Sequence, residues 1–422
     1  MDVNAKALLG GKPSLPHPVT GGRHRFSAMI KPIGPSCNLN CSYCYYLSKK
    51  ELLSLPVSPL VSDDILTKHI RDTLLDNDSA EVIFDWQGGE PTLLGLEFFK
   101  KVVKLQEQYC PPNKSFLNNL QTNGTLLDAD WCRFLRDNRF LVGISIDGPK
   151  TLHDTYRRDK GGNPTFDRVM ASVKLLKKTG VEFNTLTVIN RLNAKYPLDV
   201  YRFLTREVGP RLIQFIPLVE PKGFDQIAPQ YWDPATIPVV GTPAARPGSP
   251  ESIVHDWSVD PDDLGAFLCR VFDEWHQRDI GKHFVNLFES SVAVWAGLPA
   301  QMCVFSKICG TAVVLECDGT LYSCDHYAYP EYRLGNIRNK TLGEMIFSDR
   351  QVSFGLNKNK SLPSTCRHCE VLFACWGECP RNRFVKAPDG EPGLNYFCPA
   401  YKRFFAHINA RLTTLVKTLK LT

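Results

Sequence analysis

Long apolar runs are absent from this 422-residue sequence. No stretch approaches the ~18 consecutive apolar residues that a membrane-spanning helix needs. The first residues, MDVNAKALLGGKPSLPHPVTGG, also lack the apolar stretch of about 7 to 15 residues that a secretory signal peptide carries. These absences predict a protein that stays in the cytoplasm and has no membrane partner.

A strong charge of one sign is absent as well. The formal net charge is +6 and the pI is about 8.5, and the short basic runs YRRDK and LLKKTG are separated by acidic residues. We interpret these runs as solvated surface, which argues against a nucleic-acid partner. Hydrophobic residues make up 43% of the chain and charged residues 22%, as in soluble globular proteins. The length predicts one large domain with a second domain attached.

Cysteine, by contrast, is plentiful, with fifteen residues. A disulfide framework is not expected, because the cytoplasm keeps thiols reduced and a chain of this length does not need cross-links. Bound metal accounts for the cysteines better. Three of them, Cys37, Cys41 and Cys44, lie in KPIGPSCNLNCSYCYYL with no fourth cysteine within sixty residues. A closed zinc site takes four ligands, so this C-x3-C-x2-C loop leaves one coordination position open.

Short apolar strands and amphipathic helices alternate along most of the chain. Strands are predicted at 28–33, 81–86, 115–121, 140–146, 181–189 and 212–218. Helices are predicted at 63–76, 96–109, 128–138 and 166–180, from about 197, and at 262–279. This alternation predicts a parallel sheet with helices outside, either doubly wound or a partly closed barrel. In both architectures the cysteine loop, QGGEP, QTNG and SIDGP follow strands and face the same mouth.

Two segments depart from this alternation. Residues 221–258 contain seven prolines and little periodicity, which indicates an insertion that is either a lid or a surface loop. From about residue 300 the alternation ends and cysteines become frequent, which indicates a second domain. The predicted organisation is an N-terminal extension (1–27), a barrel (28–295), a cysteine-rich domain (296–405) and a C-terminal helix (406–422).

Eight cysteines of the second domain are enough for two four-thiolate sites. Such sites suit two [4Fe-4S] clusters or two zinc ions, and the C-x2-C-x5-C-x3-C fragment does not distinguish them. Cys110, Cys132 and Cys269 fall in predicted helices, where a lone cysteine is usually a small buried hydrophobe. We interpret Cys317, in a turn, as a further non-ligand. The eight candidate ligands are Cys303, Cys309, Cys324, Cys366, Cys369, Cys375, Cys379 and Cys398.

The cysteine loop, followed by Tyr45 and Tyr46 at the end of the first strand, resembles the radical S-adenosylmethionine (SAM) superfamily. GGEP at 88–91, after the second strand, strengthens the resemblance. It implies a [4Fe-4S] cluster on three thiolates, whose open iron is chelated by the amino acid end of SAM. Reduction then cleaves the cofactor to methionine and a 5′-deoxyadenosyl radical that abstracts hydrogen.

The cysteine spacing of the tail resembles the SPASM extension, which binds two auxiliary [4Fe-4S] clusters. Together with WQGGEPTL, SIDGPKTLHDTYRRD and LYSCDHYAYPEYRLGNI it makes the chain similar to anaerobic sulfatase-maturating enzymes. These oxidise one cysteine or serine of a sulfatase to formylglycine without oxygen. The resemblance implies a partial (β/α)6 barrel with a SPASM domain and three [4Fe-4S] clusters. It also implies SAM, a nascent or unfolded sulfatase polypeptide as substrate, and a flavodoxin- or ferredoxin-type reductant.

The resemblance also implies roles for individual residues. Asp325 would be the base that takes a proton from the substrate thiol or hydroxyl, and an adjacent cluster of negative charge is expected to raise its proton affinity. Gln87 and Tyr46 would contact the substrate peptide. The residues that line SAM would be Tyr43, Gly89, Ser145, Arg157 and Leu218. The cluster ligands would be Cys37, Cys41 and Cys44; Cys303, Cys309, Cys324 and Cys379; and Cys366, Cys369, Cys375 and Cys398.

Two alternatives stay open at this point. A SPASM-type maturase of ribosomally made peptides, forming thioether or carbon-carbon bonds, would use the same cofactors, but such enzymes commonly carry a peptide-recognition domain before the barrel. A zinc-bound adaptor without turnover would be colourless, whereas iron-sulfur protein is brown. The preference for cysteine or serine, the client sulfatases, the electron donor, the oligomeric state and the role of 221–258 do not follow from the sequence.

Overall fold

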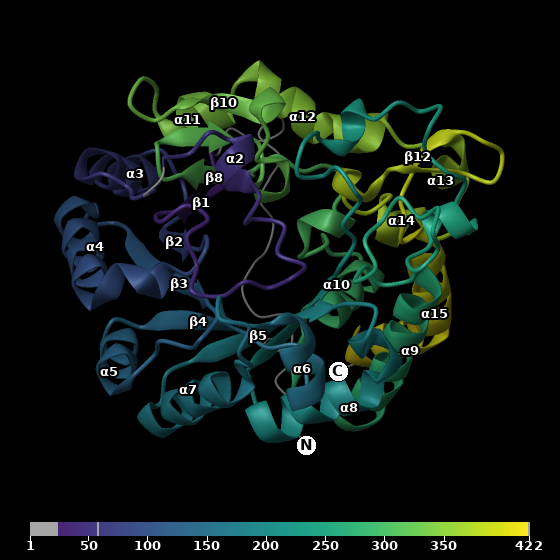
Figure 1. The fold of residues 1–422 in the computed structure, drawn as a ribbon, viewed down its shortest axis with the longest axis horizontal. Coiled ribbons are helices and arrows are strands. Elements are labelled where there is room, and N and C mark those ends of the chain that lie inside the picture. The colour runs from purple at the N-terminus through teal and green to yellow at the C-terminus, as the bar shows by residue number, and fades with distance from the viewer. Residues whose placement is uncertain (1–23, 57–58, 421–422) are drawn as a thin grey trace.

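The computed structural model describes residues 24–56 and 59–420, and most of its strands form one curved sheet (Figure 1). The strand order is β10-β9-β8-β1-β2-β3-β4-β5-β6-β7. From β1 to β7 the order follows the chain, whereas a doubly wound sheet reverses at a switch point. The predicted partial barrel is therefore the correct alternative. Its parallel strands are β1 (Ser27–Lys31), β2 (Glu81–Trp86), β3 (Ser115–Thr122), β4 (Phe140–Ser145), β5 (Phe183–Ile189), β6 (Leu212–Pro217) and β7 (Phe284–Val285).

The helices of the barrel lie outside the sheet, as Figure 1 shows, and most begin and end where local signals place them. The Asp128 side chain accepts from two backbone amides at the start of α5, and Gly180, at φ 73°, ends α7. The sequence did not predict α2, α6 or α10. The helices of this part are α2 (Lys49–Leu52), α3 (Asp63–Leu75), α4 (Gly95–Tyr109), α5 (Ala129–Asp137), α6 (Lys150–Tyr156), α7 (Phe166–Thr179), α8 (Pro197–Phe203), α9 (Pro261–Arg278) and α10 (Asn286–Trp295).

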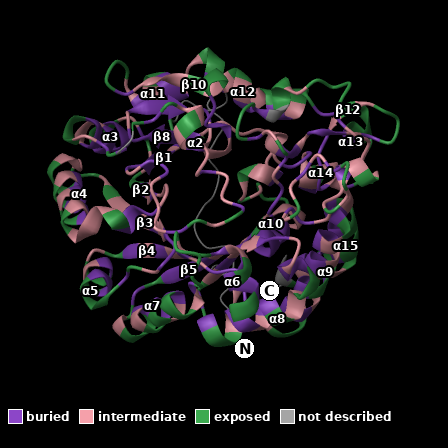
Figure 2. Cartoon of the chain, viewed as in Figure 1, coloured by how far each residue is buried: buried purple, intermediate pink, exposed green. Residues whose placement is uncertain are grey.

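The sheet buries one face of its strands against these helices (Figure 2). In β2 the side chains of Val82, Phe84 and Trp86 are buried, whereas Ile83 between them is 44% exposed. Because successive side chains of a strand point to opposite faces, Ile83 points into the barrel. Ile83, on the interior face of the sheet, is therefore not fully covered by the other described side chains of the barrel.

The cysteine-rich part continues the barrel sheet. β8 (Ala312–Glu316) pairs in parallel with β1, with Lys31 opposite Glu316, and β9 (Thr320–Tyr322) and β10 (Arg333–Asn336) extend the edge. The sequence did not predict this pairing, which brings Glu316 and the residues that follow β9 to the mouth of the barrel. The remaining elements are α11 (Leu342–Ile346), α12 (Asp349–Lys360), α13 (Ser364–Arg367), α14 (Leu372–Cys375), β11 (Val385–Lys386), β12 (Pro392–Leu394) and α15 (Cys398–Lys420).

The C-terminal helix α15 begins at Cys398, earlier than the 406 expected from sequence. The Asn395 side chain accepts from the amide of Phe397 at 2.8 Å, and the Cys398 amide donates to the Asn395 carbonyl, so this turn fixes the start of the helix. Most of the expected N-terminal extension, and residues 421–422, lie outside the described residues. No helix in the described part of the chain is both long and apolar enough to cross a membrane.

The proline-rich segment 221–258 packs against the cysteine-rich part. Tyr329 donates its hydroxyl to the Phe224 carbonyl at 2.7 Å, and the rings of Phe224 and Phe384 lie 5.9 Å apart. The Val240 amide donates to the carbonyl of Lys386 in β11 at 2.9 Å. The segment therefore ties the barrel to the cysteine-rich part.

Glu289 on α10 provides a test of the buried charge in this fold. Its side chain is nine-tenths buried, and its Oε1 has no hydrogen-bond partner among the described residues. Burial raises its pKa from 4.5 to about 7, so folding opposes ionisation and stability falls as pH rises from 4.5 to about 7. Glu289→Gln is therefore expected to raise the melting temperature above pH ~7, with a gain of up to about 3 kcal/mol, and to change little at pH ~4.5.

Glu274→Gln is the matched control for this prediction. Glu274 on α9 accepts from Arg202 Nε at 3.0 Å and Nη2 at 3.1 Å, and that pair lowers its pKa. The control is expected to lower the melting temperature at neutral pH. A pH-independent gain for Glu289→Gln would mean that packing, and not charge burial, sets its effect.

Candidate active site and cluster sites

The loop with Cys37, Cys41 and Cys44 follows β1 and rests on the QGGEP turn. The amide of Gly89 donates to the Gly34 carbonyl, and that of Glu90 donates to the Ser36 carbonyl, each at 2.8 Å. A Cβ atom on Gly89 would lie 1.9 Å from the Ser36 oxygen, so only glycine allows this approach. The two motifs therefore form one unit at the carboxyl end of β1 and β2.

The loop thiols lie in a desolvated site. Burial is the main cause that raises the pKa of Cys37 to about 11 and that of Cys41 to about 12, and each is raised further by the neighbouring thiols. The Leu39 amide donates to the Cys37 sulfur at 3.3 Å. Because Cys37 and Cys41 resist ionisation on their own, a loop of three thiols here fits a metal cluster, whose iron ions stabilise thiolates.

Tyr43 and Arg157, both expected to line SAM, meet at a third residue. The Tyr43 hydroxyl donates to Asp147, and Arg157 donates to the two oxygens of the same carboxylate at 2.9 and 3.2 Å. Burial opposes the charge of Arg157 most strongly, but Asp147, Tyr43 and Cys41 together outweigh burial and raise the pKa. Asp147 also accepts from the amide of Val188 in β5. The sequence predicted that SIDGP lies at the mouth, but not that Asp147 binds both Tyr43 and Arg157.

The other residues expected at the cofactor lie at the same edge of the sheet. Ser145 ends β4, and its hydroxyl accepts from Gln121 at 3.0 Å. Leu218 follows β6, is buried, and donates its amide to the Ile189 carbonyl at 2.9 Å. Gln87 follows β2 and is half-buried. The structure thus gathers strand ends from β2 to β6 around one mouth.

Glu90 organises this mouth and was missed as a functional residue. It is fully buried and accepts from the Thr122 hydroxyl and the Asn123 amide, each at 2.7 Å. Burial raises its pKa, which the hydrogen bonds oppose. The sequence held a signal for this role. Glu90 belongs to GGEP and its partners belong to QTNG, and both motifs follow strands whose ends meet at the mouth.

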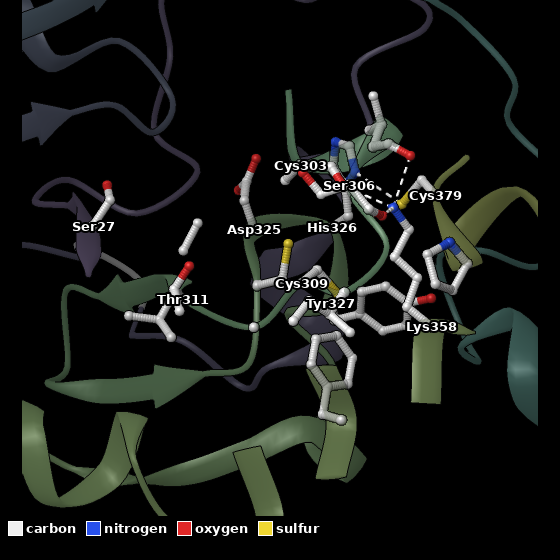
Figure 3. Close-up of a pocket in the computed structure, with 18 of the residues that line it drawn as sticks. Ser27, Cys303, Ser306, Cys309, Thr311, Asp325, His326, Tyr327, Lys358 and Cys379 are labelled. Carbon is white, nitrogen blue, oxygen red and sulfur yellow. Dashed lines mark hydrogen bonds between the residues drawn. The ribbon is translucent and has the colours of Figure 1, made fainter. Parts of the chain in front are cut away.

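Asp325 lies in a 3-10 turn (Asp325–Tyr327) directly after Cys324 (Figure 3). Lys31 Nζ is 2.7 Å from its Oδ1, and the Tyr45 hydroxyl donates to its Oδ2 at 2.5 Å. The Lys31 side chain is 2% exposed, but that of Asp325 is 20% exposed. The carboxylate is therefore held from two sides and still accessible to another molecule.

The pKa of Asp325 is lowered to about 2, opposite to the expected direction. Burial is the largest single effect and raises it, but the Lys31 ammonium, the neighbouring His326 and the hydrogen bonds from Lys31 and Tyr45 together outweigh burial. The expectation considered only the neighbouring thiolates and did not include Lys31. A lysine inside the apolar strand AMIKPI was a signal that it has a buried partner.

Tyr46 lies deeper than the mouth. It is 3% exposed, its hydroxyl donates to Glu316 Oε2 at 2.6 Å, and Lys31 Nζ lies 4.1 Å from the centre of its ring. Burial raises the pKa of Glu316 to about 7, although Lys31 opposes this. Of the two adjacent tyrosines, Tyr45 is the one that contacts Asp325.

The first set of four cysteines in the cysteine-rich part lines a cavity of about 720 Å³ that also reaches Asp325 (Figure 3). Lys358 enters from α12, and its Nζ donates to the carbonyls of Cys303 and Val304, each at 2.8 Å. Burial is the main cause that raises the pKa of Cys309 to about 11, which Lys358 opposes. The set consists of Cys303, Cys309, Cys324 and Cys379.

The second set lines a separate cavity of about 490 Å³. Burial raises the pKa of Cys375 and of Cys398 to about 12, and the other thiols of the set add to it. Four thiols that line one cavity supply, in each case, the number of ligands that a four-thiolate cluster takes. Cys317 is buried and lines neither cavity. The second set consists of Cys366, Cys369, Cys375 and Cys398.

Known proteins match both parts of the chain. Residues 32–204 match the radical SAM superfamily, and residues 303–370 match an iron-sulfur cluster-binding domain, SPASM. The serine-type anaerobic sulfatase-maturating enzyme of Bacteroides thetaiotaomicron is 44% identical over 391 residues, which are 93% of this chain and 91% of that protein. The chain belongs to the anaerobic sulfatase-maturating enzymes. It is therefore a radical SAM enzyme with an iron-sulfur SPASM domain, as its motifs predicted.

Two further comparisons place this sulfatase-maturating enzyme within its family. The cysteine-type enzyme of Clostridium perfringens is 33% identical, over 93% of this chain and 99% of that protein. The structure of anSMEcpe with bound AdoMet has a TM-score of 0.78 at 32% identity, covering 93% of this chain and 99% of that chain. The same protein has been solved with AdoMet and a Cp18Cys peptide. The predicted fold class is therefore confirmed.

Proposed function

We propose that this sulfatase-maturating enzyme oxidises one side chain of a sulfatase polypeptide to formylglycine without oxygen. The position of Asp325 carries the proposal. Its carboxylate binds Tyr45, the residue after Cys44, and its backbone follows Cys324. An accessible carboxylate thus lies between the cofactor-cluster loop and the first auxiliary cluster site, where a substrate side chain must lose both hydrogen and electrons.

The residues divide into four groups by role. Three [4Fe-4S] clusters would be held by the cysteine loop and the two auxiliary sets, and SAM would be lined by Tyr43, Gly89, Ser145, Arg157 and Leu218. Gln87 would contact the peptide directly, whereas Tyr46, which is buried with its hydroxyl on Glu316 and Lys31 over its ring, would shape the peptide site by holding those two residues. When bound, SAM and the clusters supply a 5′-deoxyadenosyl radical for hydrogen abstraction and acceptors for the second electron. Asp325 takes the proton of the substrate thiol or hydroxyl, and Lys31 keeps it ionised and ready to accept it.

Serine is the proposed target in the client sulfatase. The identity of 44% to a serine-type enzyme, against 33% to a cysteine-type enzyme, supports this choice. A competition between equal amounts of serine and cysteine forms of one sulfatase-motif peptide, followed by mass spectrometry, tests it. The serine form is expected to be consumed faster, with loss of two hydrogens. Faster consumption of the cysteine form would reverse the assignment.

Gln87 offers a test of the peptide site. It follows β2 at the mouth and has no proposed part in metal or cofactor binding, so Gln87→Ala is expected to raise the KM for peptide about 10-fold. Slow cofactor cleavage without peptide should continue at its normal rate. Gln121→Ala is the matched control, because Gln121 donates to Ser145 at the cofactor and its loss should slow both activities. If Gln87→Ala lowered peptide turnover and peptide-independent cofactor cleavage equally, Gln87 would support the cofactor site instead.

A further inference from the structure

A short hairpin, residues 158–163, lies directly against the cysteine loop. The Asn40 amide donates to the Arg158 carbonyl at 2.8 Å, and Leu39 forms an antiparallel bridge with Asp159. The hairpin leads from α6 into α7 and is therefore anchored at both ends. It forms part of the outer wall of the proposed cofactor-cluster site.

The outer surface of this hairpin is cationic. Arg158 and Lys160 are exposed, and neither forms an ion pair with a described residue. Arg158 donates to the Gly162 carbonyl at 3.0 Å, which holds its guanidinium on the hairpin. The acidic residue between them, Asp159, is paired with Arg168 at 3.0 Å. Two cations therefore face solvent without a balancing acid.

The cysteine loop reaches the surface beside these cations. Asn40 and Ser42 are exposed, and Cys41 between them is half-buried. An electron delivered at this surface would therefore have a short path to a cluster held by Cys41. The hairpin and Asp325 lie on different sides of β1 in the sheet order, because the hairpin follows β4 whereas Asp325 follows the β8–β9 hairpin. Figure 1 shows α6 and β8 on opposite sides of the mouth.

We propose that Arg158 and Lys160 form the docking surface for an acidic one-electron carrier protein of the flavodoxin class. The proposal rests on the function proposed above, because the cofactor cluster must be reduced. The reduced flavin gives up one electron and the cluster gains it. Encounters between redox proteins bury little area and are steered by complementary charge, so two unpaired cations are sufficient to guide them.

The double charge reversal Arg158→Glu/Lys160→Glu tests this surface. Stopped-flow absorbance under anaerobic conditions gives the second-order rate constant for cluster reduction by flavodoxin hydroquinone. The rate constant is expected to fall about 10-fold or more at low ionic strength, with a much smaller fall at high ionic strength. Binding of flavodoxin to the enzyme without clusters, measured by biolayer interferometry, should weaken in parallel. Reduction by photoreduced 5-deazariboflavin, a small uncharged donor, should not change.

Lys104→Glu/Lys417→Glu is the matched control, since both lysines are exposed on outer helices, α4 and α15. It makes the same change in net charge and should leave flavodoxin-driven reduction nearly normal. Equal loss in the two variants, wild-type reduction in the hairpin variant, or no reduction of the wild type by flavodoxin would each overturn the docking surface. If the hairpin variant showed a raised KM for peptide but normal cluster reduction by flavodoxin, the hairpin would contact the peptide substrate instead of the carrier protein. Failure of 5-deazariboflavin to produce cofactor cleavage in the wild type would count against the proposed function itself.

Discussion

Asp325→Asn is expected to lower formylglycine formation by ~10²-fold or more while SAM cleavage continues. Asparagine keeps the shape of the side chain and removes the proton acceptor. The ion pair with Lys31 and the hydrogen bond from Tyr45 keep the carboxylate ionised and oriented, which is the form that the proposed role as proton acceptor requires. In the proposed mechanism hydrogen abstraction precedes this step, and a peptide deuterated at Cβ should therefore still transfer deuterium to 5′-deoxyadenosine.

Asp318→Asn is the matched control for this variant. Asp318 lies in the same segment, but its carboxylate accepts from the amide and hydroxyl of Thr320, each at 2.9 Å. Its loss should disturb the turn without removing the base. Near-normal formylglycine yield in Asp325→Asn, with all clusters intact, would refute the role of Asp325. The base would then be Asp318, His326 or an ordered water.

The triple variant Cys37→Ala/Cys41→Ala/Cys44→Ala is expected to abolish SAM cleavage. After anaerobic reconstitution the wild type should hold about twelve iron and twelve sulfide, and the variant about eight of each, because the two auxiliary sets lie in separate cavities. Iron and sulfide assays measure the loss, and circular dichroism checks the fold. Cys317→Ala is the matched control, since Cys317 is buried outside both cavities. A full iron complement in the triple variant would contradict the ligand assignment.

Six of the seven parallel strands, β1 to β6, could be predicted because each carries its own local signal, whereas the two-residue β7 was not predicted. β2 occupies the predicted residues 81–86, and the other five differ by at most two residues at either end. The attachment of β8 to β1 could not be predicted, because it depends on pairs such as Ile30 with Leu315 that are far apart in the sequence. That pairing is what brings Lys31 and Glu316 together.

The candidate site could likewise be predicted only in part. The cysteine sets, Arg157 and Asp325 could be proposed from motif spacing and family resemblance. The distinction between Tyr45 and Tyr46 could not, because adjacent residues leave the loop in different directions and only the structure shows that one hydroxyl meets Asp325 and the other Glu316. The charge state of Asp325 was missed for a related reason, since its partner Lys31 lies on a different strand.

Deuterium transfer from the target serine tests the proposed reaction most directly. A sulfatase-motif peptide with two deuterium atoms at the Cβ of its target serine is incubated anaerobically with the reconstituted enzyme, SAM and a reductant. Formylglycine is expected to form, and mass spectrometry of both products should find one deuterium in 5′-deoxyadenosine for each formylglycine. Unchanged peptide alongside continued SAM cleavage, or formylglycine without deuterium in 5′-deoxyadenosine, would contradict the proposed reaction.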